Sequence, residues 1–301
     1  MAARLDTPAM RAAVGALARA GVKVALVPTM GALHEGHASL IRRSRTDGHK
    51  TLVSIFVNPA QFGPSEDFGR YPRTHDADVE LATKAGADMV WFPQVHDLYP
   101  SAEPGAPPRL GVAGTMHINA GPAGAELCGA SRPGLFDGVC TVVMKLFQLS
   151  RVDVAYFGEK DWQQLVIIRQ MAREFHLDVS LHGEPIIRDP DGLAMSSRNR
   201  YLQPDQRDAA LAIHRTLRLA QAEFAVGERS AARLAQTLHA RWRDEEAAAQ
   251  SCKLRLDYLS LREPESLLPS KELSGNTRLI MAAFLGEPVV RLIDNADLSG
   301  V

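Results

Sequence analysis

The stretch VKVALVPTMGALHEGHASLIRRSR, residues Val22–Arg45, joins a strand pattern directly to a helix pattern. Its first six residues, Val22–Val27, are nearly all apolar, as expected for a strand buried on both faces of a sheet. From about Glu35 to Arg45, apolar residues recur at the spacing of an amphipathic helix. A buried strand followed at once by a helix is the building unit of parallel α/β sheets.

The same alternation continues through the first half of the chain. Further strands are expected at Thr51–Val57, Asp88–Phe92 and Val152–Phe157, and further helices at Ala77–Ala85, Leu135–Leu149 and Trp162–Phe175. This order predicts an α/β fold with a parallel sheet and helices on both of its faces. Two Gly- and Pro-rich segments, Asn58–Arg73 and Pro93–Gly134, lack a regular pattern and have the length of binding loops or lids.

The pattern of the chain changes near Arg188. Two long amphipathic helices are expected at about Pro204–Val226 and Arg229–Ala249, before strands at Leu254–Leu261, Arg278–Phe284 and Pro288–Ile293. Helices followed by consecutive strands predict a small α+β domain with an antiparallel sheet. We therefore expect an N-terminal domain of residues 1–186 and a smaller C-terminal domain of residues 187–301.

Length and composition agree with a globular protein of about two domains. The chain has 301 residues, of which 46% are apolar and 23% charged, and its net charge of −1 gives no basic excess for nucleic acid or an anionic membrane. Three distant cysteines without a CxxC pair argue against a disulfide framework and a Cys-rich zinc site. Without a signal-peptide core or a bilayer-spanning apolar run, we expect a cytoplasmic protein.

Common phosphate- and metal-binding signatures are absent from the sequence. There is no Gly-Lys dipeptide and hence no Walker A loop, and no expected strand runs into GxGxxG. His34 and His37 are three residues apart, whereas a zincin needs histidines four apart, and no third ligand is evident. We therefore predict no protein-built metal site.

The turn after the first expected strand carries the clearest functional signal. The carboxyl edge of an open parallel sheet is where ligands bind, and a helix N-terminus suits phosphate oxygens. Gly31 and Gly36 allow the backbone to approach a ligand, and His34 and His37 share one face of the helix. We interpret this turn as a nucleotide site; the alternative is a pair of ordinary surface histidines.

Three further segments offer polar groups that suit the same task. Lys160 follows a strand and precedes a helix, with Gln164 one turn later. The turn Met195–Arg198 carries two hydroxyls and a guanidinium, which bind phosphate oxygens well. Asn58 and Gln61 follow the second strand and suit the hydroxyls of a small polar substrate. Taken alone, the Lys160 segment is better interpreted as a capped helix with a solvated lysine. The other two segments have a polar linker and a turn as their alternatives.

Together these segments make the chain resemble the pantothenate synthetase (pantoate–β-alanine ligase) family. The runs that carry the resemblance, in that family's order, are PTMGALHEGH, SIFVNPAQFG, ASRPGLFDGV, FGEKDWQQL, DGLAMSSRNRYL and VRLIDN, and they lie between about residues 20 and 295. The family belongs to the nucleotidyltransferases, whose HIGH-like signature matches His34 and His37 and whose KMSKS-like signature matches Met195–Arg198.

The resemblance implies a fold, a reaction and a set of site residues. The fold is a Rossmann-like domain with a smaller lid domain, in a homodimer. The reaction joins (R)-pantoate to β-alanine through a pantoyl-adenylate, with ATP and Mg²⁺, and releases pyrophosphate and AMP. The implied ATP-binding residues are Met30, Gly31, Ala32, Leu33, His34, Glu35, Gly36, His37, Gly158, Glu159, Lys160, Asp161, Ile187, Met195, Ser196, Ser197 and Arg198. The pantoate and β-alanine site is expected to contain Met30, Asn58, Gln61 and Gln164.

Such a reaction needs positioning and charge stabilisation more than covalent help from the protein. The catalytic set expected at the phosphates is His34, His37, Lys160, Ser196, Ser197 and Arg198, with Mg²⁺ bridging phosphate oxygens. One position departs from the family, because Leu135 stands where members commonly carry His. Two alternatives stay open: a related enzyme that leaves the nucleotide on its product, and a nucleotide-binding regulatory protein without turnover.

Overall fold

The structure is a computed structural model that describes all residues except 64–65, 103–109, 111–114 and 301. The chain divides into two compact units. Unit 1 consists of Met1–Glu159 and Ile167–Pro185, and unit 2 of Lys160–Val166 and Ile186–Val301. The division into linear domains of residues 1–186 and 187–301 stays a prediction. Parts of the two expected binding loops lie outside the described residues.

Unit 1 is built on a six-stranded parallel sheet with the strand order β1-β4-β3-β2-β5-β6. In that order the strands are Ala3–Leu5, Met89–Trp91, Lys50–Ile55, Val24–Thr29, Val154–Gly158 and Ser180–Glu184. The expected parallel sheet is therefore confirmed. The strands β1 and β6 were not predicted, because neither contains a run of apolar residues: both are edge strands, and their sequences are ARL and SLHGE.

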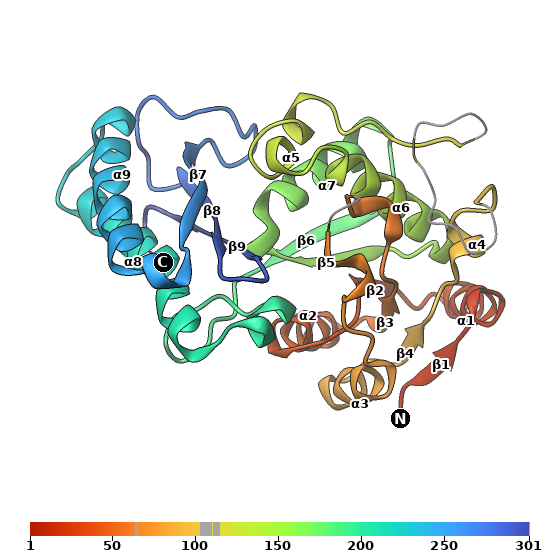
Figure 1. The fold of residues 1–301 in the computed structure, drawn as a ribbon. Helices are drawn as coiled ribbons and strands as arrows, with labels where there is room; N and C mark the ends of the chain where they lie inside the picture. Colours follow the sequence, from red (N-terminus) through yellow and green to blue (C-terminus); the bar gives the residue numbers. More distant parts are fainter. Residues whose placement is uncertain (64–65, 103–109, 111–114, 301) are drawn as a thin grey trace. The chain divides into compact units, whose positions relative to one another are not determined.

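Helices cover both faces of this sheet, as predicted. Figure 1 shows α2 and α3 on one side of the strands and α1 with α6 on the other. The helices of unit 1 are α1 (Thr7–Arg19), α2 (Glu35–Thr46), α3 (His75–Ala85), α4 (Val95–Leu98), α5 (Cys128–Ser131) and α6 (Leu135–Ser150). The next helix, α7 (Trp162–Glu174), begins among the residues of unit 2 and continues among those of unit 1. Among the described residues, none of the helices has the length and apolar character needed to cross a bilayer.

Unit 2 contains a three-stranded antiparallel sheet, which confirms the predicted α+β architecture. The strands β7 (Arg255–Arg262), β8 (Arg278–Leu285) and β9 (Val290–Asp297) pair in that order. The helices are α8 (Pro204–Ala225) and α9 (Ala231–Ala248), preceded by the 3-10 helix η5 (Ser197–Tyr201). The last strand was expected to end at Ile293, because the residues that follow are polar, but it continues to Asp297.

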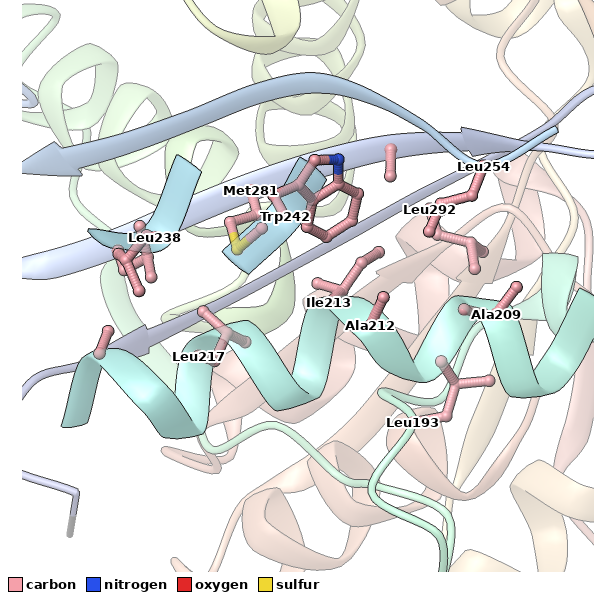
Figure 2. Close-up of a cluster of buried hydrophobic side chains, with 14 of the residues drawn as sticks. Leu193, Ala209, Ala212, Ile213, Leu217, Leu238, Trp242, Leu254, Met281 and Leu292 are labelled. Atoms are coloured by element: carbon pink, nitrogen blue, oxygen red, sulfur yellow. The ribbon is translucent and has the colours of Figure 1, made fainter. Parts of the chain in front are cut away.

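The hydrophobic core of unit 2 lies between its helices and its sheet. In Figure 2, Ile213 and Leu217 project from α8 toward Met281 of β8 and Trp242 of α9. Trp242 and Leu217 are each 1% exposed, so the helices shield this face of the sheet from water. Full burial of side chains of this size stabilises a fold by roughly 1.5–3 kcal/mol each. This core supports β8 and β9 on one face. Polar residues of the same two strands hold the loops described below.

Candidate active site

The turn between β2 and α2 is shaped by the two histidines themselves. His34 is the N-cap of α2, and its Nδ1 accepts a hydrogen bond from the Gly36 N–H at 3.2 Å. The Nδ1 of His37 accepts from the His34 N–H, also at 3.2 Å. Because a ring nitrogen that accepts a hydrogen bond carries no proton, these contacts assign the ring proton of each histidine to Nε2. The pair, with ring centroids 4.1 Å apart, thus provides two N–H donors at a helix N-terminus.

Gly36 is required by this arrangement. A Cβ atom at position 36 would lie 2.9 Å from Cε1 of His34, closer than real side chains pack. The glycine therefore leaves room for the imidazole that caps the helix. This gives a packing reason for the glycine between the two histidines, beside the backbone approach that the sequence suggested.

A buried carboxylate holds the preceding residues in place. Asp78 of α3 is 2% exposed, and its Oδ2 accepts from the Ala32 N–H at 3.1 Å, while its Oδ1 accepts from the Leu33 N–H at 2.7 Å. Its Oδ1 also accepts from Oγ1 of Thr74 at 3.1 Å. Gly31 has φ +82°, where only glycine is unstrained, and a Cβ there would lie 3.1 Å from Oδ2 of Asp78. Asp78 thus fixes the turn that carries His34.

Asp78 was not predicted as a site residue, although its position in the helix carries a signal. The residue lies four and seven positions before Ala82 and Ala85, so it shares the buried face of its helix with them. A charged residue on such a face needs hydrogen-bond partners. An acidic residue in a first helical turn is also favoured by the helix dipole, so the sequence alone does not distinguish a loop contact from a dipole effect.

Two of the expected substrate-binding residues meet within unit 1. Gln61 follows β3 and Met30 follows β2, and the Gln61 amide donates to the Met30 sulfur at 2.9 Å. Arg132 lies at the end of α5 and donates to the Gln61 carbonyl at 3.1 Å and to Oε1 of Glu66 at 2.6 Å. Arg132 belongs to the ASRPGLFDGV run, and its contacts with Gln61 and Glu66 were not predicted. Nearby, Leu135 begins α6 and is 8% exposed, so it is packed as an apolar residue.

Asn58, expected at the substrate site, makes its hydrogen bonds within the protein, and its contact with a substrate stays a prediction. It is 1% exposed, and its Oδ1 accepts from the Tyr99 hydroxyl at 2.7 Å and from the Ala60 N–H at 3.3 Å. Its Nδ2 donates to Oε1 of Gln61 at 3.1 Å and to the Gly138 carbonyl at 3.2 Å. Both donors and both lone pairs are therefore in use. Burial raises the pKa of Tyr99, so its phenol stays protonated and keeps donating. Asn58 is suited to orient Gln61.

Lys160 is held by the sheet of unit 2. Its carbonyl accepts from Nδ2 of Asn295 in β9 at 2.9 Å. Two residues later, the Trp162 indole donates to the Pro264 carbonyl at 3.0 Å, and the guanidinium of Arg278 stacks 3.5 Å from the centroid of its ring. The segment around Lys160 is therefore tied to unit 2 at both ends. The sequence did not reveal these contacts.

The Met195–Arg198 turn is also fixed within unit 2. Ser196 caps η5 by accepting from the Arg198 N–H at 3.2 Å, and the Met195 N–H donates to the Ile187 carbonyl at 2.9 Å. Arg188 lies at the base of this loop and donates to both carboxylate oxygens of Asp294, at 2.6 and 3.1 Å. These contacts hold the base of the loop that contains Ser196, Ser197 and Arg198.

The expected site residues divide between the two units. Unit 1 contains Met30 to His37, Asn58, Gln61, Gly158 and Glu159, and unit 2 contains Lys160, Asp161, Gln164, Ile187 and Met195 to Arg198. Their convergence on one ligand stays a prediction. Among the described residues, no group of three or more His, Cys, Asp and Glu side chains is arranged to hold a metal ion.

Comparisons with known proteins place the chain in a family. A family model described as pantoate-beta-alanine ligase matches residues 5–297. The pantothenate synthetase of Geobacter sulfurreducens is 45% identical over 280 residues, which make up 93% of this chain and 92% of that protein. The crystal structure of pantothenate synthetase from Thermus thermophilus has a TM-score of 0.85 at 36% identity and covers 98% of this chain and 99% of its own.

A second solved structure carries ligands. The pantoate-beta-alanine ligase from Francisella tularensis, complexed with beta-gamma ATP and beta-alanine, has a TM-score of 0.76 at 29% identity and covers 99% of this chain and 98% of its own. Family model, relatives and structures agree over nearly the whole chain, which confirms the resemblance carried by the six sequence runs. The chain belongs to the pantoate–β-alanine ligase, or pantothenate synthetase, family.

Proposed function

We propose that this chain binds ATP through its two nucleotidyltransferase signatures and uses it to condense (R)-pantoate with β-alanine. A carboxylate does not acylate an amine at neutral pH, because its leaving group is too poor. Attack of the pantoate carboxylate on the α-phosphate of ATP releases pyrophosphate and forms a pantoyl-adenylate. The β-alanine amine then attacks the acyl carbon, and AMP leaves.

The observation that carries this proposal is the hydrogen bonding of His34 and His37. Each Nδ1 accepts a backbone N–H, which assigns the proton of each ring to Nε2 and supports a role for both rings beside the N-terminus of α2. Oriented donors at a helix N-terminus stabilise phosphate oxygens and the charge that develops on them. We assign the two rings to the phosphates of ATP, with His37 as the proton donor, and Lys160, Ser196, Ser197 and Arg198 to the same phosphates.

Pantoate is assigned to the amides of Gln61 and Gln164, with Met30 beside it and β-alanine near Gln61. The contact between Gln61 and Met30 supports a shared site for these two residues. Asn58 is assigned to the orientation of Gln61, since its own hydrogen bonds are made inside the protein. An amide donates and accepts at once, which suits the hydroxyls and carboxylate of a small hydroxy acid.

Further parts of the proposal follow from family membership. Mg²⁺ is assigned to the phosphate oxygens of ATP, where it neutralises charge and needs few protein ligands. Residues 187–301 are assigned as a lid that keeps water from the acyl-adenylate, which hydrolyses when wet. A homodimer in the cytoplasm, without nucleic acid or membrane partners, completes the assignment.

Exchange of labelled pyrophosphate into ATP tests the proposal. With Mg²⁺ and pantoate but no β-alanine, the enzyme should exchange the label, because the adenylation half-reaction is reversible. Omission of pantoate is the matched control and should abolish exchange. Addition of β-alanine should give free AMP and pantothenate. A nucleotide retained on the product would favour the related transferase, and ATP binding without exchange or turnover would favour a regulatory protein.

A further inference from the structure

Two adjacent residues of β9, Asp294 and Asn295, hydrogen-bond to the two segments of unit 2 that contain the candidate phosphate-binding residues. One segment contains Lys160, and the other runs from Arg188 to Arg198. Neighbouring residues of a strand point to opposite sides, so one short stretch can serve two loops. Asp294 pairs with Arg188, which lies just before the Ser196–Arg198 turn, and Asn295 binds the Lys160 carbonyl. The two residues are 4% and 1% exposed. They end the VRLIDN run, to which neither the sequence nor the reaction gave a role.

Asn295 uses both ends of its amide. Its Oδ1 accepts from Arg278 at 2.6 Å while its Nδ2 donates to the Lys160 carbonyl at 2.9 Å. Arg278 in turn stacks on Trp162, so the same pair of residues holds the chain on both sides of Asp161. The main chain of Lys160 is thereby fixed to the antiparallel sheet. The direction of its Cα–Cβ bond, from which the side chain extends, is fixed as well.

Asp294 holds its loop through Arg188. Besides the two bonds to Asp294, Arg188 donates to the Gly192 carbonyl at 3.1 Å, and its main chain pairs with Ala194. This closes the loop at its base, next to Met195. The strand β9 also lies beside η5, which contains Ser197 and Arg198. The Ser196–Arg198 turn and Lys160 are therefore both held in place by strand β9.

We propose that the Asp294–Asn295 pair sets the placement of Lys160 relative to the Ser196–Arg198 turn, and that both are positioning residues for the adenylation step. The proposal rests on the proposed function, in which these two segments bind one triphosphate. Placement matters because an error of about 1 Å in a group that stabilises the transition state can reduce the rate about 10²-fold. Neither Asp294 nor Asn295 needs to touch ATP for this effect.

The test is a double-mutant cycle between Asn295 and Lys160, measured by pantoate-dependent pyrophosphate exchange in the full-length enzyme. Asn295→Asp keeps the acceptor for Arg278 but places an oxygen against the Lys160 carbonyl. We expect kcat for exchange to fall about 10- to 10²-fold while the KM for ATP changes less than about 3-fold. In a Lys160→Ala background the same substitution should have no further effect beyond about 2-fold, because the side chain that Asn295 is proposed to position is gone.

Glu245→Gln is the matched control. Glu245 is buried in unit 2 and pairs with Arg215, yet it contacts neither segment. This variant should lower the melting temperature and leave kcat at assay temperature unchanged, which separates positioning from general destabilisation. If the added charge prevents Asn295→Asp from folding, Asn295→Leu, similar in size and uncharged, takes its place in the cycle.

Each result has a definite meaning. Losses that multiply across the cycle, or a kcat unchanged in the Asn295 variant, would overturn the positioning role while leaving the proposed function intact. A wild-type enzyme without pantoate-dependent exchange would overturn the proposed function, and the inference with it. A large drop at Asn295 that disappears in the Lys160→Ala background supports both.

Discussion

Asp78 in unit 1 and the Asp294–Asn295 pair in unit 2 both brace loops of the candidate site, but they do so through different contacts. Asp78 is a helix residue whose carboxylate accepts two N–H groups directly from the turn that carries His34. In unit 2 the residues belong to a strand. Asp294 acts there through the side chain of Arg188, and Asn295 binds the main chain of Lys160.

The difference concerns how strongly each loop depends on one side chain. Removal of the Asp78 charge weakens the hydrogen bonds of two buried N–H groups at once, and buried donors without partners are expensive. The Lys160 segment has a second support in Trp162, which bonds to Pro264 and stacks on Arg278. We therefore expect the unit 1 turn to be more sensitive to a single substitution than the unit 2 segments.

The largest effects should come from residues assigned to bind the phosphates, rather than from residues that position them. His37→Ala and Lys160→Ala should each reduce the rate of pyrophosphate exchange about 10²–10³-fold, the range for the loss of one charge-stabilising donor. Each rate should be measured at saturating ATP and pantoate. A variant within 2-fold of wild type would remove that residue from the mechanism.

Asp78→Asn should have the next largest effect. In the variant an NH₂ group replaces one of the two carboxylate oxygens and faces a backbone N–H, to which it cannot form a hydrogen bond. The free energy of unfolding should therefore fall by about 1–3 kcal/mol. Displacement of the His34 turn should reduce kcat for exchange by about 10²-fold. Urea unfolding and exchange kinetics measure the two effects. Asp76→Asn is the control, because Asp76 lies in the same helical turn with a 90% exposed side chain; comparable losses in both variants would contradict the role of Asp78.

Tyr99→Phe should change pantoate binding more modestly. It removes one hydrogen bond from Oδ1 of Asn58, and a bond of this kind contributes about 1 kcal/mol. Gln61 should then be oriented less firmly, which predicts a rise of about 5-fold in the KM for pantoate. The KM for ATP in the same variant is the internal control. Equal increases for both substrates would point to a general loosening of unit 1.

The smallest effect is expected at His214 of α8. Burial and the nearby Arg188 lower its pKa from the usual 6.5, and its Nδ1 is buried with no hydrogen-bond partner among the described residues. The unfolded chain therefore takes up the proton first, so stability is lost as pH falls through 6.5 toward the lower folded value. His214→Gln removes this contribution. Unfolding free energies of both proteins at about pH 7.5 and 5.5, on either side of the unfolded pKa, should show the smaller decrease in the variant; parallel curves would contradict the assignment.

The fold could be predicted where side-chain burial follows a simple period. Strands such as β2 and β3 are buried on both faces, so their apolar runs were visible, and the helices between them show the expected spacing. The edge strand β6 is half-buried and mixed in sequence, so it gave no such signal. The helix α1 did offer one, in the Asp6 cap and the proline that follows in its first turn.

The candidate site could be predicted only as far as its residues follow one another in the chain. His34 and His37, or Ser196 to Arg198, are recognisable because the motif and the local structure coincide. Asp78, Tyr99 and Asn295 act on those motifs from distant parts of the sequence, and their contacts depend on tertiary packing. The sequence signal for such a contact is a polar residue at a position that the pattern expects to be apolar and buried. In β9 the polar residues after Ile293 were instead interpreted as the end of the strand.

The division of α7 has a consequence for any attempt to dissect the molecule. Because the Trp162 ring stacks with Arg278 and its indole donates to the Pro264 carbonyl, a C-terminal fragment that starts at Ile186 would lose both contacts, one on β8 and one in the loop after β7. The amide of Asn295 would also lose its acceptor. Expressed alone, such a fragment should be less stable than the same residues in the whole chain, and a peptide of residues 160–166 should restore part of the loss.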